Sequence, residues 1–385
     1  MNSNLKPSSS ISLYIHLPWC KAKCPYCDFN SHAAEQIPAE RYAQALIADL
    51  DRELPHIWGR RLQSIFIGGG TPSLFPPSVI EHLLSEIRAR IQPLSAIEVT
   101  MEANPGAIEA AAFRDFRGAG ITRLSLGIQS FNDIFLQRLG RIHDAISAHR
   151  AIERAIAAEF TSFNLDLMFA LPGQSRLDAQ SDLQAALRYQ PPHLSLYQLT
   201  LEAGTPFASH PPQHLPDSDQ AADMETDLRT QLEAGGLSRY EVSAHARPAE
   251  QCQHNRNYWL YGDYVGIGAG AHGKITLPEG IWRSRKPSRP ESYMNDALST
   301  VDSLGSREFI APKDRPFEFM LNALRLTEGF PLALFLERTG LSTVLIEPQL
   351  RRAQRDGLLT LHQEVVKPTP LGINFYNDLC ARFIP

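Results

Sequence analysis

The sequence has few cysteines and no long hydrophobic run. Five of its 385 residues are cysteine, and three of these cluster, which is not the arrangement of a disulfide framework. No stretch approaches the roughly 18–20 consecutive apolar residues of a membrane span. Residues 1–10 are polar and lack the apolar core of a signal peptide. We therefore expect neither secretion nor membrane insertion, and a reducing, cytoplasmic location that keeps the thiols free.

A concentration of basic charge is also absent. The net charge is -5 and no run of Lys or Arg stands out, so we expect no nucleic-acid partner. The composition, with 43% hydrophobic and 21% charged residues, is that of a globular chain with a sizeable core. Because 385 residues exceed what one core usually supports, we expect one large domain and a smaller one.

The three clustered cysteines carry the clearest chemical signal. Cys20, Cys24 and Cys27 form a CxxxCxxC motif, and the residue that could have been a close fourth cysteine is Phe29. Three thiolates without a fourth can hold an iron-sulfur cluster and leave one iron open to an outside ligand. A structural zinc site is the alternative, which this spacing, without a local His or fourth Cys, suits poorly.

Apolar strand patterns alternate with amphipathic helical patterns over the first half of the chain. The strands read as continuous hydrophobic runs, which is typical of a parallel sheet covered by helices. Repeated βα units indicate an α/β barrel or a doubly wound sheet. The expected strands are residues 12–17, 64–67, 97–102, 123–128, 162–169 and 194–200, and the expected helices are 39–54, 77–90, 108–119, 145–158 and 176–188.

The pattern changes after about residue 273. Residues 277–290 contain Pro and Arg and are expected to form a loop. Helical patterns at 314–326, 332–338 and 345–356 precede a hairpin at 358–368 and a last helix from 371, an order that resembles a winged-helix module. We therefore predict two domains, residues 1–290 and 291–385. DNA binding by the second is disfavoured by the acidic balance.

Polar groups follow several of the predicted strands. The run Gly68-Gly69-Gly70-Thr71 comes directly after one strand, where glycines permit close backbone approach to a ligand. Glu102, Gln129 and Asp166 lie at or near the ends of three more apolar runs. Each taken alone is more typical of a capped or core polar residue, but the ends of parallel strands are where an α/β barrel places its site.

These motifs, in this order, resemble the radical S-adenosylmethionine (SAM) superfamily and, within it, the oxygen-independent coproporphyrinogen III oxidase-like family. The resemblance spans residues 12 to about 330 and implies a radical SAM partial (β/α) barrel with a C-terminal helical, winged-helix-like domain. It also implies a [4Fe-4S] cluster whose open iron is chelated by SAM. The SAM-binding residues that it implies are Tyr14, Tyr26, Gly69, Gly70, Thr71, Glu102, Gln129, Arg141 and Asp166, with Thr200 and His272 as two positions whose residue types differ from those of the oxidase.

One further element distinguishes two branches of that family. The oxidase carries another Cys at the position of Phe29 and a longer N-terminal segment, whereas this chain has His254-Asn-Arg-Asn-Tyr258-Trp259. This HNxxYW element resembles the heme-binding signature of the family's heme chaperones. An imidazole is a common axial heme ligand, and Tyr258 and Trp259 offer flat faces to a porphyrin. Without the family, a His beside aromatic residues is more often a packed core residue.

The sequence therefore predicts a heme chaperone that binds heme and transfers it to acceptor hemoproteins, with a membrane surface as one place where these could be met. The alternative is an enzyme, a radical SAM coproporphyrinogen dehydrogenase. Cys252 is a second potential iron ligand, ranked below His254, and no spacing singles out His16, His32, His143 or His245. The glycine-rich run at 266–273 lacks the dinucleotide-binding pattern, so a close approach to SAM or heme is the better interpretation.

Overall fold

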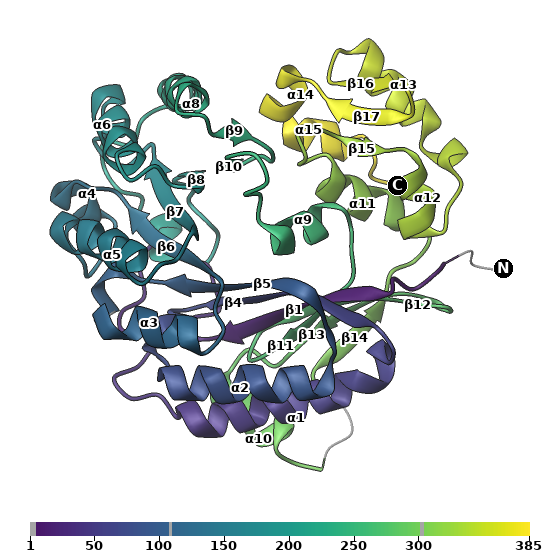
Figure 1. Ribbon diagram of the computed structural model, residues 1–385. Helices are drawn as coiled ribbons and strands as arrows, with labels where there is room; N and C mark the ends of the chain where they lie inside the picture. The colour runs from purple at the N-terminus through teal and green to yellow at the C-terminus, as the bar shows by residue number, and fades with distance from the viewer. Residues whose placement is uncertain (1–4, 108–109, 301–303) are drawn as a thin grey trace.

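The computed structural model describes residues 5–107, 110–300 and 304–385 (Figure 1). Its central feature is a curved sheet of 12 strands in the order β14-β13-β12-β11-β1-β4-β5-β6-β7-β8-β10-β9. The last two strands in this order are β10 (Ala244–Ala246) and β9 (Ser238–Arg239). Seven neighbouring strands are parallel, from β11 through β1 and β4 to β8. Six of them follow one another in chain order, which confirms the predicted partial (β/α) barrel. The seven parallel strands are β11 (Tyr264–Ile267), β1 (Ser10–Leu17), β4 (Arg61–Gly69), β5 (Pro93–Ala103), β6 (Arg123–Gln129), β7 (Ser162–Phe169) and β8 (His193–Gln198).

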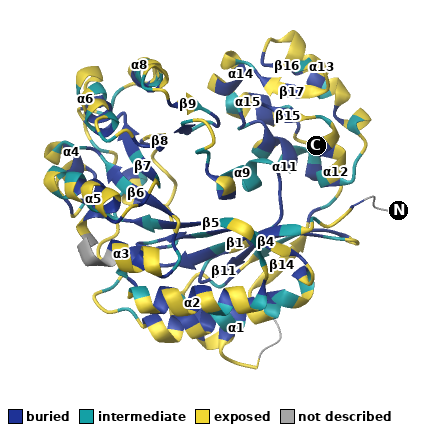
Figure 2. Cartoon of the chain, in the orientation of Figure 1, coloured by how far each residue is buried: buried dark blue, intermediate teal, exposed yellow. Residues whose placement is uncertain are grey.

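Helices cover the outer face of this sheet and turn their exposed side to solvent, as Figure 2 shows by the yellow outer faces over dark blue strands. The strands are long buried runs because both of their faces are covered. The covering helices are α1 (Ala39–Ile57), α2 (Pro77–Arg90), α3 (Ala110–Gly118), α5 (Ala145–Ala157), α6 (Arg176–Leu187) and α8 (Ser218–Ala234). Five of them confirm predicted helices, although positions 108 and 109 of one prediction lie outside the described residues.

The prediction of a loop at 277–290 was wrong. Residues Gly280–Arg285 form β13, which pairs antiparallel with β12 (His272–Leu277) and with β14 (Ser306–Phe309). The hydrogen bonds from β12 make this segment a strand, although its Pro- and Arg-containing sequence does not suggest one by itself. These strands extend the sheet beyond β11 and bring the side chains of β12 and β13 toward the carboxyl ends of the parallel strands.

The C-terminal part has its own buried core, which includes Phe319, Phe335 and Val366. It consists of helices around the antiparallel sheet β15-β17-β16, the helix-then-hairpin order that the sequence predicts. The division into residues 1–290 and 291–385 stays a prediction, since α10 (Pro290–Ala297) packs on α1 and β14 pairs with β13. The C-terminal elements are α11 (Arg315–Ala323), β15 (Phe330–Pro331), α12 (Ala333–Thr339), α13 (Glu347–Arg355), β16 (Leu359–His362), β17 (Val365–Pro368), α14 (Pro370–Asn374) and α15 (Tyr376–Ala381).

A buried ion-pair network ties α1 to the β13 side of the sheet. The Lys286 ammonium lies 2.5 Å from an Asp49 oxygen and 2.7 Å from a Glu53 oxygen. Asp49 also accepts a hydrogen bond from the Tyr293 hydroxyl on α10 at 2.8 Å. Opposite charges hold the pKa of Lys286 above its usual range, although burial alone would lower it. The network fixes the segment between β13 and α10 against α1, close to the site described next.

No helix within the described residues is long and apolar enough to cross a membrane.

Candidate cofactor site at the carboxyl ends of the strands

The cysteine loop lies directly after β1 and beside the glycine loop that follows β4. The register of these two strands places Leu17 opposite Gly69. Cys20, Cys24 and Cys27 are half-buried free thiols, and the Thr71 side chain of the glycine loop hydrogen-bonds to Cys20. The two motifs that the sequence singled out therefore form one surface.

The pKa values of two of the three thiols, Cys20 and Cys27, are raised. Burial is the main cause for Cys20 and Cys27, and the Cys24 sulfur adds to both. Among the described residues, no three His, Cys, Asp or Glu side chains meet closely enough to enclose a single metal ion. A [4Fe-4S] cluster binds each thiolate to a different iron, so its ligands are spread more widely than those of zinc. Three thiols with no close fourth ligand in the described part of the chain match a [4Fe-4S] cluster that leaves one iron open.

The glycines of the second loop are required by close packing. A Cβ atom on Gly69, whose φ is +117°, would lie 2.7 Å from the His16 ring, and one on Gly70 would lie 2.5 Å from the Trp19 carbonyl oxygen. The Gly69 amide donates to a Glu102 carboxylate oxygen at 3.1 Å. Only a residue without a side chain lets this backbone lie against the cysteine loop.

Two carboxyl groups lie along the next strands. Burial, and then the charge of Asp166, raises the pKa of Glu102 to about 7, while the Gly69 amide opposes this shift. Burial also raises the pKa of Asp166, against hydrogen bonds from Asn164 and Ser125. Glu102 is therefore poised to change its charge near neutral pH, where a cationic ligand such as a sulfonium would favour the ionised form.

Arg141 and Gln129 gather at the end of β6. Arg141 Nη1 lies 3.6 Å from the Cys24 sulfur and 3.4 Å from the Tyr26 hydroxyl, and Nη2 donates to the Gly127 carbonyl at 3.0 Å. A Cβ atom on Gly127 would meet both Gln129 Nε2 and Arg141 Nη2. Gln129 itself has a φ of +70°, an uncommon conformation for a residue other than glycine. Predicted residues from two distant segments thus meet beside Cys24.

A cavity of about 740 Å³ opens between the strand ends and these loops, a volume in the usual range of small-molecule sites. Of the predicted site residues, Tyr14, Gly69, Glu102, Tyr258 and His272 line it. Thr200 does not, and its hydroxyl donates to Glu202 at 2.7 Å. Trp259 lies outside it as well, stacked under the Arg325 guanidinium at 4.3 Å.

The HNxxYW element forms α9 (Gln253–Trp259), a short helix inside the curve of the sheet (Figure 1). The Glu98 carboxylate accepts hydrogen bonds from the Gln253 and His254 amides at 3.1 and 3.2 Å, so it satisfies the free N–H groups at the start of the helix. The Cys252 thiol also donates to Glu98, at 3.3 Å, and burial raises its pKa to about 12. Cys252 therefore serves the helix start in this arrangement, as a neutral thiol.

His254 is fully buried and both of its ring nitrogens are occupied. Nδ1 is hydrogen-bonded to the Ser64 hydroxyl at 3.0 Å and Nε2 to the Tyr258 hydroxyl at 2.9 Å. Burial lowers the pKa of His254 to about 3, so the ring is neutral. The His254 imidazole thus fixes the Tyr258 ring. Tyr258 lines the cavity, whereas His254 does not.

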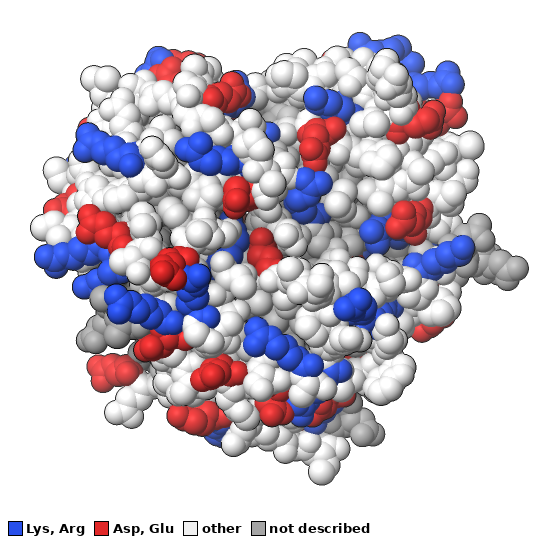
Figure 3. All heavy atoms as spheres, in the orientation of Figure 1, with Lys and Arg blue, Asp and Glu red and all other residues white. Residues whose placement is uncertain are grey.

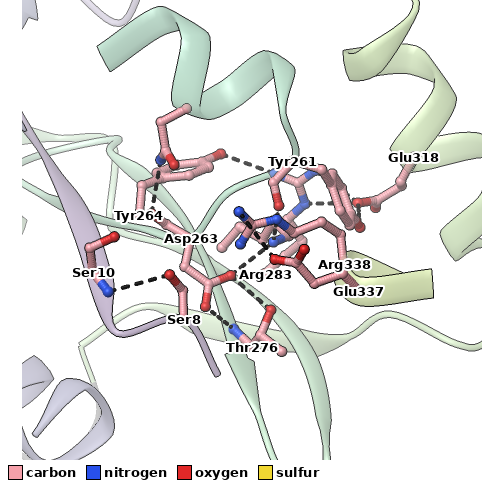
Figure 4. Close-up of polar contacts among 12 residues, drawn as sticks. Ser8, Ser10, Tyr261, Asp263, Tyr264, Thr276, Arg283, Glu318, Glu337 and Arg338 are labelled. Carbon is pink, nitrogen blue, oxygen red and sulfur yellow. Dashed lines mark hydrogen bonds and ion pairs between the residues drawn. The ribbon is translucent and has the colours of Figure 1, made fainter. Parts of the chain in front are cut away.

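Several lining residues were not predicted as binding residues. Tyr264 packs against Tyr258 with 4.4 Å between ring centroids. Arg283 donates a hydrogen bond to the Tyr264 hydroxyl at 3.0 Å (Figure 4). Arg285, Asn30 and His32 also line the cavity. Their sequence signal is weak: Tyr264 lies just before the glycine-rich run at 266–273, Arg285 lies in the segment predicted as a loop, and His32 follows the cysteine motif. Charges of both signs are interspersed over the face shown in Figure 3.

Comparison with known proteins gives two family matches. The Radical SAM superfamily matches residues 14–186, and the HemN C-terminal domain matches residues 310–375. The heme chaperone HemW of Escherichia coli (strain K12) is 46% identical over 376 residues, which are 97% of this chain and 98% of that protein. The heme chaperone HemW of Bacillus subtilis (strain 168) is 31% identical over 378 residues, with 97% and 99% covered.

A solved structure shows the same fold at lower identity. The coproporphyrinogen III oxidase HemN from Escherichia coli, described as a radical SAM enzyme, superimposes with a TM-score of 0.83 at 21% identity. The match covers 100% of this chain and 92% of that chain. At this identity the likeness establishes the architecture of barrel and C-terminal domain, not the activity.

Proposed function

Because this chain belongs to the radical SAM superfamily and, within it, to the HemW family, we propose that it is a heme chaperone that binds heme and passes it to acceptor hemoproteins. The observation that carries the proposal is the shared cavity. Tyr258 of the HNxxYW element lines the same space as Gly69 and Glu102 of the predicted SAM site. A porphyrin bound there would lie beside the cluster.

The cluster and SAM would be held by this chain's residues as follows. Cys20, Cys24 and Cys27 supply three thiolates for a [4Fe-4S] cluster. The glycine loop, from Gly69 to Thr71, offers backbone groups to the methionyl end of SAM, and the carboxylates of Glu102 and Asp166 favour its positive charge. Arg141 stays next to the thiolate of Cys24, whose charge it balances. When bound, a reduced cluster of this kind supplies electrons to SAM. The remaining SAM contacts that the family resemblance implies are Tyr14, Tyr26, Gln129, Thr200 and His272, although Thr200 does not line the cavity.

We assign the HNxxYW element to the heme site in two roles. Tyr258 contacts the porphyrin directly, with Tyr264 packed edge-to-face against it. His254 can act as an axial iron ligand only after it gives up its hydrogen bonds to Ser64 and Tyr258. Trp259 acts from outside the cavity, because its contact with Arg325 joins α9 to the C-terminal domain.

The second candidate is a coproporphyrinogen dehydrogenase, favoured by the fold shared with the HemN oxidase. A hydrogen-abstracting enzyme must keep water away from its radical intermediates. Phe29, where the oxidase has a further Cys, is 59% exposed. The open cavity mouth beside Phe29 favours a carrier over radical chemistry. We further propose a cytoplasmic location, with acceptors that include hemoproteins at a membrane surface.

Heme uptake and release test the proposal. The reconstituted protein is titrated with heme under anaerobic conditions and the Soret band is followed. It is then mixed with apomyoglobin as a generic heme acceptor. We expect saturable binding and transfer of the bound heme. Failure to bind heme, with cluster and SAM in place, would contradict the chaperone assignment.

A further inference from the structure

The imidazoles around the cavity differ in whether their nitrogens are free. His16 is hydrogen-bonded through Nδ1 to the Tyr14 hydroxyl at 2.9 Å and through Nε2 to the Asn30 carbonyl at 2.8 Å. His254 is occupied on both sides as well. Iron ligation needs a nitrogen lone pair that points into open space. Neither His16 nor His254 offers one in this arrangement. His32 Nε2 has no partner among the described residues, but this nitrogen is buried and does not point into open space.

His272 offers such a nitrogen. Its side chain is exposed, it lines the cavity, and its ring has no hydrogen-bond partner among the described residues. It begins β12, directly after the glycine-containing turn at 268–271, so the strand ladder fixes its backbone. Partial burial and the positive charges of Arg285 and Arg283 lower the pKa of His272. The ring is therefore neutral at physiological pH, the form that binds iron.

Arg285 lies next to His272. The two residues are direct partners in the antiparallel register of β12 and β13, which places their side chains on one face, about 5 Å apart at the Cβ atoms. Arg285 lines the cavity and has no ion-pair partner in the part of the chain that the structure describes. A free guanidinium suits a carboxylate, which it can bind through two parallel hydrogen bonds.

The neighbouring wall offers aromatic surface. Tyr258 and Tyr264 line the cavity, and both rings are held from behind, Tyr258 by His254 and Tyr264 by Arg283. In Figure 4, Arg283 lies between Tyr264 and Glu318, to which it donates at 2.8 Å. Rings fixed in this way can stack on a flat apolar ligand at little entropic cost.

An imidazole, a guanidinium and fixed aromatic rings match the three parts of heme: its iron, its propionates and its macrocycle. We propose that His272 is an axial ligand of the heme iron and that Arg285 binds a heme propionate, while His254 positions Tyr258. This inference rests on the proposed heme chaperone function. It gives His272 a role different from the SAM contact that the family resemblance implies for that position.

The test uses the full-length reconstituted protein and the variants His272→Gly, His254→Ala and Arg285→Ala. His362→Ala, an exposed histidine on β16 far along the chain from the site, is the control. Each is titrated with heme and followed by the Soret band and by electron paramagnetic resonance. We expect His272→Gly to change the ligand-field signature and to weaken binding by about tenfold or more, in the range seen when metal-site support is lost. Added imidazole should restore the wild-type signature.

Arg285→Ala should weaken heme binding but leave the binding of heme dimethyl ester unchanged, because the ester has no propionate charge to lose. A wild-type signature in His272→Gly, or its loss in His254→Ala or in His32→Ala instead, would overturn the inference while leaving the chaperone function intact. If the wild-type protein itself does not bind heme, the proposed function fails first. Reduced SAM affinity in His272→Gly with unchanged heme binding would return this residue to the SAM site.

Discussion

Two walls of the cavity are built in opposite ways. On the α9 wall, the polar groups around His254 are satisfied: His254 uses both ring nitrogens, and the Glu98 carboxylate accepts hydrogen bonds from amides at the start of the helix. On the loop wall, formed by residues 20–32 with His272 and Arg285, several polar groups are left free, although Lys23 and Asn30 donate to backbone carbonyls. One example is His32 Nε2, which is buried with no partner among the described residues.

The difference separates scaffold from binding groups. A buried polar group without a partner is costly, so its retention beside a cavity is typical of a group that a ligand completes. A satisfied group instead holds its neighbours in place. The comparison predicts that changes on the loop wall reduce ligand binding with little loss of stability, and that changes in satisfied groups do the reverse.

The largest effect on binding should come from the cysteine loop. Replacing Cys20, Cys24 or Cys27 with Ser should reduce reconstituted iron from about four atoms per chain, the content of a [4Fe-4S] cluster, to a small fraction of that. The melting temperature of the cluster-free protein should hardly change, because these thiols are half-buried. Iron analysis and thermal unfolding measure the two. Cys380→Ala, in the C-terminal core, is the matched control and should keep its iron.

The largest effect on stability should come from the Lys286 network. Lys286→Met leaves Asp49 buried without a cation and Glu53 with Arg307 alone, and breaking a buried pair typically lowers the free energy of unfolding by about 3–5 kcal/mol. Arg41→Met, which removes an exposed pair with Glu291, should change it by only about 0–1 kcal/mol. Urea denaturation of the cluster-free protein measures both. Equal losses would remove the distinction between buried and exposed pairs.

His254→Ala should affect stability more than ligation. The change empties a buried site and leaves the Ser64 and Tyr258 hydroxyls without their partner, so we expect about 2–3 kcal/mol lower unfolding free energy. The Soret maximum of the heme complex should stay close to that of the wild type, with weaker binding through a less ordered Tyr258. A strong Soret shift with unchanged stability would place His254 on the iron instead.

The smallest effect is a pH dependence of SAM binding. The pKa of Glu102 is raised to about 7, so the carboxyl is largely neutral at pH 6 and ionised at pH 8. If the charge of Glu102 favours the SAM cation, the affinity for SAM should fall by up to about tenfold as the pH drops from 8 to 6. The limit is about tenfold because, one pH unit below its pKa, only about one carboxyl in ten is still ionised. Calorimetric titration of the reconstituted protein measures this. Glu102→Gln should bind weakly at both pH values, and a steep dependence that survives in this variant would argue against Glu102.

The barrel and part of the site could be predicted because local signals and topology agree. Helix α2 begins at Pro77 as predicted, since proline suits the first helical turn. The long apolar runs of β1 and β7 can only be buried strands. The CxxxCxxC and GGGT motifs then meet because neighbouring parallel strands end at the same edge.

The sequence could not show which partners each polar side chain has in the folded protein. Nothing local shows that His254 is tied to Ser64, 190 positions away. The pairing of His272 with Arg285 depends on a hairpin that was predicted as a loop. Both facts are products of tertiary packing, and they decide which imidazole is free.

The most direct test of the central claim compares heme binding with turnover in the same preparation. The reconstituted protein is supplied anaerobically with reductant, SAM and coproporphyrinogen III, and protoporphyrinogen is followed by fluorescence after oxidation; a parallel sample is titrated with heme. A heme chaperone should bind heme saturably and form no protoporphyrinogen beyond the background given by Cys24→Ser. Robust turnover that depends on the cluster, together with no heme binding, would contradict the account.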